Sequence, residues 1–140
     1  MKTLGFIGTG GMGGPMAANL IKAGHRLVIN DIRREVTRSL ESQGAQFKDS
    51  PKAVAEASEV VLSMLPYNEA VKEVGLGRSG LHEAAGGAKL WVDISSIDKK
   101  TILEVNAELQ KKRLEDSRRF RRRCGGASRR RRSLTLGLGT

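Results

Sequence analysis

Hydrophobic and polar positions along the chain alternate between short apolar runs and stretches with helical spacing. Apolar runs typical of buried strands occupy residues 3–7, 26–30, 45–47, 59–65 and 90–94. Apolar residues recur at helical spacing in the segments that follow them, 16–23, 33–43, 51–58, 67–74 and 99–112. Strands that alternate with helices indicate βαβ units, which build a parallel sheet covered on both faces. We therefore predict an α/β fold with a doubly wound parallel sheet.

Glycine, serine and proline mark several boundaries of these elements. Gly24 and Gly44 each follow a helical segment, where a glycine commonly ends a helix. Ser50 and Pro51 open another, because serine caps a helix and proline fits its first turn. A glycine-rich connection is expected over residues 75–88.

The first apolar run leads into a glycine turn. Gly8, Gly10 and Gly13 form a G-x-G-x-x-G pattern between this run and a helix. With seventeen glycines in the chain, the triplet alone means little, but its place between a strand and a helix is typical of dinucleotide sites. There, Gly8 allows a tight turn, Gly10 lets the backbone approach a pyrophosphate, and Gly13 lets helix and strand pack closely. Free N–H groups at the helix start hold the phosphates. The pattern predicts a Rossmann-type domain.

An acidic residue ends the second apolar run. Asp31 lies eighteen residues beyond Gly13, where a carboxylate accepts both ribose hydroxyls of NAD and repels the 2′-phosphate of NADP. Arg33 and Arg34 follow, and their guanidinium groups are equally suited to a 2′-phosphate or to the exposed start of a helix. Asp31 favours NAD, and the arginines leave NADP open.

Ligands of such sheets bind at the carboxyl ends of the strands. The functional residues are therefore expected directly after each strand, at the glycine turn, at Asp31, at Leu65-Pro66 and at Ser95-Ser96. A strand end stopped by proline and a turn leading into a helix are the plainer interpretations of the last two pairs. His25 and His82 have no partner acid or nucleophile near them in sequence, so neither is assigned as a base.

Length and composition restrict the class of protein. The 140 residues suit one domain, whereas a dehydrogenase that uses a dinucleotide normally needs a second region for its substrate. Cys124 is the only cysteine, so we expect no internal disulfide and no metal site. No apolar run reaches the length of a membrane span, and no charged and apolar leader or transit peptide precedes the first strand. We expect a cytoplasmic protein with no membrane partner.

The net charge of +10 is concentrated near the C-terminus. Residues 113–140 contain ten arginines and two acids, a net of +8, which leaves about +2 for residues 1–112. We expect residues 1–115 to form the dinucleotide-binding domain and residues 116–140 to be a disordered tail. Phe120 is the only aromatic residue of this tail, so base stacking is poorly supported and no specific nucleic acid is expected.

Six segments resemble one enzyme family in order and spacing. They are G-F-I-G-T-G-G-M-G-G-P-M-A-A-N-L-I-K-A-G-H (5–25), N-D (30–31), G-A-Q-F (44–47), S-P (50–51), S-M-L-P (63–66) and V-D-I-S-S-I-D (92–98). Through them the chain resembles the β-hydroxyacid dehydrogenases, and among these the 3-hydroxyisobutyrate dehydrogenases, whose N-terminal domain is of the 6-phosphogluconate dehydrogenase type. The resemblance covers nearly all of residues 3–112.

The resemblance implies a set of cofactor-binding residues. The pyrophosphate motif maps to Gly8, Thr9, Gly10, Gly11, Met12 and Gly13, with Thr9 where the family usually has leucine. The end of the second strand maps to Asn30 and Asp31, next to the adenosine ribose. Leu65 and Pro66 map to the pair on the adenosine side, and Ser96 to the hydroxyl near the nicotinamide and substrate.

The resemblance ends after Asp116. The family continues with a D-A-P-V-S-G-G motif that binds the substrate carboxylate, then with an all-helical domain that carries a catalytic lysine. Here, Arg118 to Arg121 read Arg-Arg-Phe-Arg, which a codon string for Ala-Pro-Val-Ser encodes when it is read one base later. We hypothesise a frameshift over residues 117–132. We therefore expect the substrate motif, the lysine and the helical domain to be missing from this chain, and we assign no catalytic residue.

These features predict the NAD(P)-binding domain of an oxidoreductase, inactive by itself. In the intact family, hydride passes between a small 3-hydroxy acid and NAD, and the full-length form is expected to be a homo-oligomer. Whether this chain is an enzyme is left open. The alternatives are a nucleotide-binding module without catalysis and, less favoured, nucleic-acid binding through the arginine-rich tail.

Overall fold

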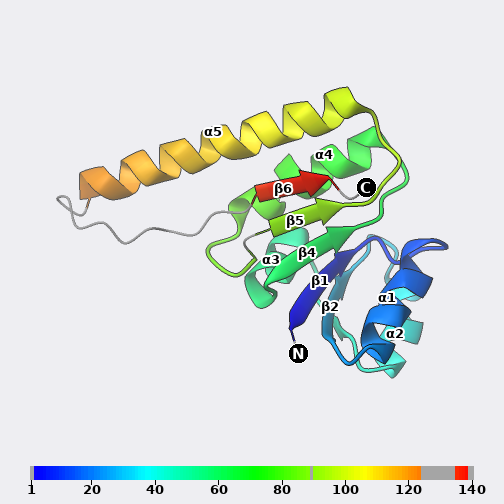
Figure 1. Cartoon of the computed structure of the whole chain (residues 1–140). Helices are drawn as coiled ribbons and strands as arrows, with labels where there is room; N and C mark the ends of the chain where they lie inside the picture. Colours follow the sequence, from blue (N-terminus) through cyan, green and yellow to red (C-terminus); the bar gives the residue numbers. More distant parts are fainter. Residues whose placement is uncertain (1, 89, 124–134, 139–140) are drawn as a thin grey trace.

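The structure is built on a parallel sheet with the strand order β3-β2-β1-β4-β5-β6 (Figure 1). This computed structural model describes residues 2–88, 90–123 and 135–138, with 113–123 and 135–138 described by their backbone alone. Every neighbouring pair of strands is parallel, which confirms the predicted doubly wound α/β fold. The strands are β1 (Thr3–Ile7), β2 (Arg26–Asn30), β3 (Gln46–Phe47), β4 (Val60–Ser63), β5 (Leu90–Asp93) and β6 (Thr135–Leu138).

Helices cover both faces of the sheet. The α-helices are α1 (Gly13–Lys22), α2 (Arg38–Ser42), α3 (Pro51–Ala57), α4 (Asn68–Leu76) and α5 (Lys99–Arg123), and two 3-10 helices are η1 (Arg34–Thr37) and η2 (Leu81–Glu83). Two separate groups of buried residues result. One joins α1 and α2 to β1 and β2, and the other joins α3, α4 and α5 to the opposite face. Alternation along β1 supplies both, because Leu4 and Phe6 face α1 whereas Ile7 faces α3.

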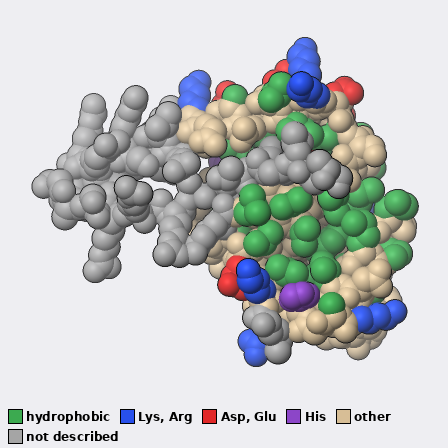
Figure 2. All heavy atoms as spheres, viewed as in Figure 1, with side chains coloured by type: hydrophobic (Ala, Val, Ile, Leu, Met, Phe, Trp, Pro, Cys, Tyr) green, Lys and Arg blue, Asp and Glu red, His purple; other side chains and the backbone are tan. Residues whose placement is uncertain are grey.

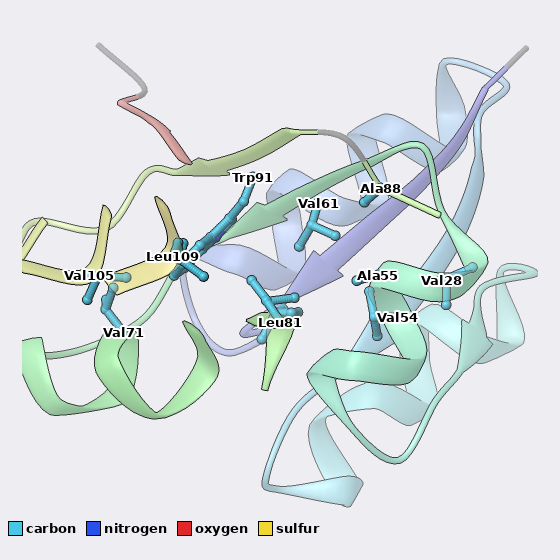
Figure 3. Packing of buried hydrophobic residues seen from close by; sticks show 11 residues of the cluster. Val28, Val54, Ala55, Val61, Val71, Leu81, Ala88, Trp91, Val105 and Leu109 are labelled. Carbon is cyan, nitrogen blue, oxygen red and sulfur yellow. The ribbon is translucent and has the colours of Figure 1, made fainter. Parts of the chain in front are cut away.

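Trp91 is the largest fully buried side chain, and it lies in the second group. Figure 3 shows it extending from β5 toward Leu109 and Val105 of α5. Val71 of α4 belongs to the same cluster and is also fully buried. The ring therefore fixes α4 and α5 against the sheet beneath the carboxyl edge of β5.

On the side of the sheet that carries α1, the described helices leave β4 and β5 less covered than β1 and β2. Val60, Leu62, Met64 and Ile94 are only partly buried there, and Leu90 is 37% exposed. Hydrophobic side chains accordingly gather in the middle of the face drawn in Figure 2. In Figure 1, α1 and α2 lie beside β1 and β2 and do not reach β5.

Several predicted elements differ from the observed ones, and the connection expected over residues 75–88 contains the end of α4 and η2. Residues 33–43 do not form one helix but η1 followed by α2. Thr37, at the junction, bonds the carbonyl of Arg34 at 2.7 Å and the carboxylate of Glu41 at 2.8 Å, so its hydroxyl stabilises the tighter turn. The fourth strand ends at Ser63 and not at Leu65, because the N–H of Leu65 donates to the Ser95 hydroxyl at 2.7 Å.

The C-terminal part also differs from the sequence-based expectation. The predicted domain boundary at residue 115 falls inside α5, which continues to Arg123. Residues Thr135–Leu138 pair with β5 as a sixth strand, in register from Leu90↔Thr135 to Asp93↔Leu138. Residues 124–134 and 139–140 of the expected tail lie outside the described residues, as does Cys124.

Candidate functional site

The glycine turn joins β1 to α1 with a geometry that only glycine satisfies at two positions. Gly8 has φ +89, and a Cβ there would lie 2.2 Å from the carbonyl oxygen of Met64. A Cβ on Gly13 would lie 1.8 Å from the carbonyl oxygen of Gly8. These two positions fulfil the predicted requirements for a tight turn and for close packing of helix and strand.

The start of α1 is open. Met12 occupies the N-cap position with no side-chain hydrogen bond, it is 67% exposed, and the first turn holds no acidic residue. A Cβ on Gly11 would meet nothing within 4 Å, and one on Gly10 would meet only the flexible guanidinium end of Arg33, at 2.9 Å. The N–H groups at this helix start therefore face a space that a ligand can enter.

Asp31 is fixed against this turn. Its Oδ2 accepts from the Thr9 N–H at 2.8 Å, and its Oδ1 accepts from the Arg33 N–H at 2.9 Å. The side chain is 8% exposed, and Nε of Arg33 lies 4.0 Å from Oδ1. Because each carboxylate oxygen can accept more than one hydrogen bond, the group retains acceptor positions beside the turn.

The remaining residues of this edge differ in exposure. The Nδ2 group of Asn30 donates to the carbonyl of Lys48 at 2.8 Å, so this buried amide joins β2 to the segment after β3. Pro66 and Ser96 are exposed, whereas Leu65 is partly buried and bonded to Ser95. The structure thus brings all the predicted residues to the carboxyl ends of β1, β2, β4 and β5, with Asn30 turned toward Lys48.

Arg33 and Arg34 have different surroundings. Arg34 bonds Glu41 and Thr37, and its guanidinium lies 3.9 Å from the ring centroid of Phe47. The hydrogen bond to Glu41 raises the pKa of Arg34, and the bonds from Arg34 and then Thr37 lower the pKa of Glu41. Arg33 is 59% exposed and reaches toward Gly10. Of the two, Arg33 is the arginine available to a ligand at the turn.

Neither histidine of the described part of the chain lies at the carboxyl edge of the sheet. His82 is 10% exposed, with Nδ1 at 2.9 Å from the carbonyl of Gly75, and His25 lies at the opposite end of α1 from the turn. Among the described residues no three metal-ligating side chains cluster, and no helix could cross a membrane. The edge is therefore suited to binding a ligand, and neither histidine is placed to transfer a proton there.

Sequence reasoning missed two buried residues of this edge, Ser63 and Asp93. Both lie on paired strands and carry polar side chains inside the apolar second cluster. An aspartate and a serine within otherwise apolar strands were the available signal. The register that brings them together was not visible in the sequence.

A family model for the "NAD binding domain of 6-phosphogluconate dehydrogenase" matches residues 3–116. The chain belongs to this family. The match includes the glycine turn and all the strand ends described above, so the predicted membership is confirmed. It ends at Asp116, where the sequence pattern also changes.

Curated relatives of this family member include dehydrogenases and a reductase. It is 44% identical over 105 residues to a 3-hydroxyisobutyrate dehydrogenase of Pseudomonas aeruginosa, covering 75% of this chain and 35% of that protein. It is 35% identical over 112 residues to the 3-sulfolactaldehyde reductase of Escherichia coli, covering 80% and 38%. The chain spans about a third of the length of the curated relatives it matches.

Solved structures support the same family. A Mycobacterium tuberculosis 3-hydroxyisobutyrate dehydrogenase with L-serine is similar at TM-score 0.70 and 31% identity, over 80% of this chain and 38% of that one. Psf3 in complex with NADP+ and 2-OPP is similar at TM-score 0.70 and 26% identity, over 78% and 39%. The domain is thus of a type that binds a nicotinamide cofactor, with its relatives acting on small molecules.

Proposed function

We propose that the carboxyl edge of the sheet binds NAD in preference to NADP, as the cofactor domain of an oxidoreductase acting on a small 3-hydroxy acid. The observation that carries this is the Asp31 carboxylate, held beside the glycine turn by the N–H groups of Thr9 and Arg33. Its remaining acceptor positions suit the ribose hydroxyls of an adenosine, and its charge opposes a 2′-phosphate.

The other predicted residues bind different parts of the cofactor. Gly8, Thr9, Gly10, Gly11, Met12 and Gly13 surround the pyrophosphate, which the open N–H groups of α1 bind. Leu65 and Pro66 provide apolar contact on the adenosine side, and Asn30 holds the end of β2 in place. Ser96, exposed after β5, lies toward the nicotinamide. The nicotinamide supplies hydride chemistry when bound, and this chain orients it.

A nucleotide-binding module without catalysis is the second candidate. It is favoured by the positions of the two histidines in the described residues, because His82 bonds the Gly75 carbonyl and His25 follows the C-terminal end of α1, away from the glycine turn. NADP is favoured over NAD only by Arg33, whose exposed guanidinium approaches Gly10. In our proposal the negative charge of Asp31 partly offsets the positive charge of Arg33.

The proposal is tested by calorimetric titration of the chain with NAD+ and with NADP+. We expect NAD+ to bind more tightly, and the Asp31→Asn variant to lose about tenfold in NAD+ affinity while its discrimination against NADP+ falls. Asp49→Asn is the matched control, because Asp49 is exposed after β3 and its side chain makes no hydrogen bond within the described residues. Tighter NADP+ binding by the unmodified chain would overturn the preference, and no binding of either would overturn the site.

A further inference from the structure

A buried polar network connects β4 and β5 beneath the cofactor edge. Ser63 is fully buried and Asp93 is 2% exposed, and the two face each other across paired strands. The Ser63 hydroxyl donates to Oδ1 of Asp93 at 2.6 Å, and the Ser95 hydroxyl donates to the same oxygen at 2.7 Å. Such a network in an apolar core carries a strong preference for one geometry.

The two N–H donors at the ends of this network determine the direction of its hydrogen bonds. The indole Nε1–H of Trp91 donates to Ser63 at 2.8 Å, and the N–H of Leu65 donates to Ser95 at 2.7 Å. An indole N–H and a backbone N–H can only donate, so each serine must accept from them and give its single proton to Asp93. Asp93 therefore fixes the orientation of both hydroxyls.

The second carboxylate oxygen of Asp93 adds no further hydrogen bond to this network. Oδ2 of Asp93 is buried and has no hydrogen-bond partner among the described residues. Within this part of the chain the two serines alone hold the carboxylate, and it alone receives their protons. Removing Asp93 leaves the Ser95 hydroxyl free to rotate away from the position in which it accepts from Leu65.

We propose that Asp93 is a positioning residue of the cofactor edge, which acts through Ser95 to hold the Leu65-Pro66 loop after β4 against the Ser95-Ser96 loop after β5. This inference rests on the proposed function, which assigns Leu65-Pro66 to the adenosine side and Ser96 to the nicotinamide end of a bound NAD. Leu65 cannot continue the pairing of β4, and its N–H depends on Ser95. Asp93 thus sets the separation of the two loops without touching the cofactor.

Amide hydrogen exchange of the unliganded chain tests the network itself. We expect the Leu65 amide to exchange about tenfold faster or more in Ser95→Ala and in Asp93→Ala, and to be restored in Ser95→Thr, which keeps a hydroxyl. The control is Ser58→Ala, which removes a buried hydroxyl that bonds the Val54 carbonyl at the opposite end of β4. Unchanged exchange at Leu65 in Ser95→Ala would overturn the proposal.

NAD+ titration then tests the consequence for the cofactor. Ser95→Ala and Asp93→Ala are each expected to weaken binding about tenfold, Ser95→Thr to stay within about twofold, and the double variant to be no weaker than Ser95→Ala. Additive losses in the double variant would show that Asp93 does not act through Ser95 and would overturn the proposal. So would a Ser58→Ala loss as large as that of Ser95→Ala, since the effect would then follow stability alone.

Two other results, a variant that does not fold and a chain that binds no NAD+, can be distinguished from failure of the proposal. If Asp93→Ala fails to fold by circular dichroism, Asp93→Asn replaces it, because its amide oxygen can still accept from Ser63 and Ser95. Trp91, the only tryptophan of the chain, reports this end of the network, and its emission should match the unmodified chain in Asp93→Asn. Unchanged emission with faster Leu65 exchange would show that the Leu65 amide does not follow the orientation of these hydroxyls, and would overturn the assigned role. If the unmodified chain binds no NAD+, the proposed function fails, whereas Leu65 exchange still decides whether Asp93 sets this loop.

Discussion

The backbone N–H of Thr9 donates to the Asp31 carboxylate across 2.8 Å, which joins the glycine turn after β1 to the end of β2. Thr9 is buried at 3% exposure, so water cannot readily replace this acceptor. The turn and the second strand therefore hold one another in place before any ligand arrives. Because the turn is already ordered, phosphate binding does not have to supply the free energy of ordering it.

Asp31→Ala should lower the free energy of unfolding by about 1–3 kcal/mol, because the buried Thr9 N–H loses its only acceptor among the described residues. Urea denaturation followed by circular dichroism measures the change. Asp49→Ala, at an exposed carboxylate of the same edge, should stay within about 0.5 kcal/mol of the unmodified chain. Equal effects of the two substitutions would contradict a structural role of the Thr9–Asp31 bond.

Gly13→Ala should destabilise the fold by about 1–3 kcal/mol and abolish measurable NAD+ binding, because its Cβ would lie 1.8 Å from the Gly8 carbonyl oxygen. The backbone of the turn must shift to relieve this overlap. Gly11→Ala is the matched control, since a Cβ there meets nothing within 4 Å and should leave the free energy of unfolding nearly unchanged. A Gly13→Ala variant with normal stability and NAD+ affinity would show that the turn is not packed as described.

Leu109→Ala should cost about 2–5 kcal/mol of unfolding free energy, because it opens a cavity beside Trp91 on the inner side of α5. Leu103→Ala, on the same helix, removes the same atoms from a side chain that is 55% exposed, and should change stability by no more than about 0.5 kcal/mol. Denaturation curves that show similar losses for both would mean that α5 does not pack on the sheet through Leu109.

The sequence pattern was sufficient for the elements whose signals are local. The apolar runs of β1 and β2 give their observed bounds, and Ser50 caps α3 as its position before Pro51 predicts, accepting from the Ala53 N–H at 3.1 Å. The glycine turn was predictable because Gly8 is required by its own positive φ of +89 and Gly13 by a contact with the nearby Gly8 carbonyl oxygen. In these cases the determining interaction lies close in sequence.

Features that depend on distant pairing were not predictable in this way. The Asp93–Ser63 bond exists only because the β4–β5 register places these residues opposite each other, thirty positions apart. Strand β6 pairs with β5 across more than forty positions, and its four residues carry too short a pattern to be recognised. The continuation of α5 to Arg123 was masked by charge, since the arginine content suggested a tail although arginine favours helices.

The stability of the η1–α2 segment should depend on pH through Glu41. Hydrogen bonds from Arg34 first and Thr37 second lower the pKa of Glu41 in the folded chain. A carboxylate with a lowered folded pKa stabilises the fold above its unfolded pKa, and this contribution disappears as the pH falls through the lowered value. The difference in unfolding free energy between the unmodified chain and Glu41→Gln should therefore be constant near neutral pH and shrink in acid.

Urea denaturation at several pH values from 7 to about 3 measures this difference. Glu35→Gln is the control, because Glu35 is an exposed carboxylate in η1, the 3-10 helix that also contains Arg34 and Thr37. Raising the salt concentration should reduce the Glu41 effect only in part, since hydrogen bonds contribute more to it than the Coulomb attraction of Arg34 does. A Glu41→Gln difference that stays constant into acid would show that the Arg34–Glu41 pair does not hold this segment.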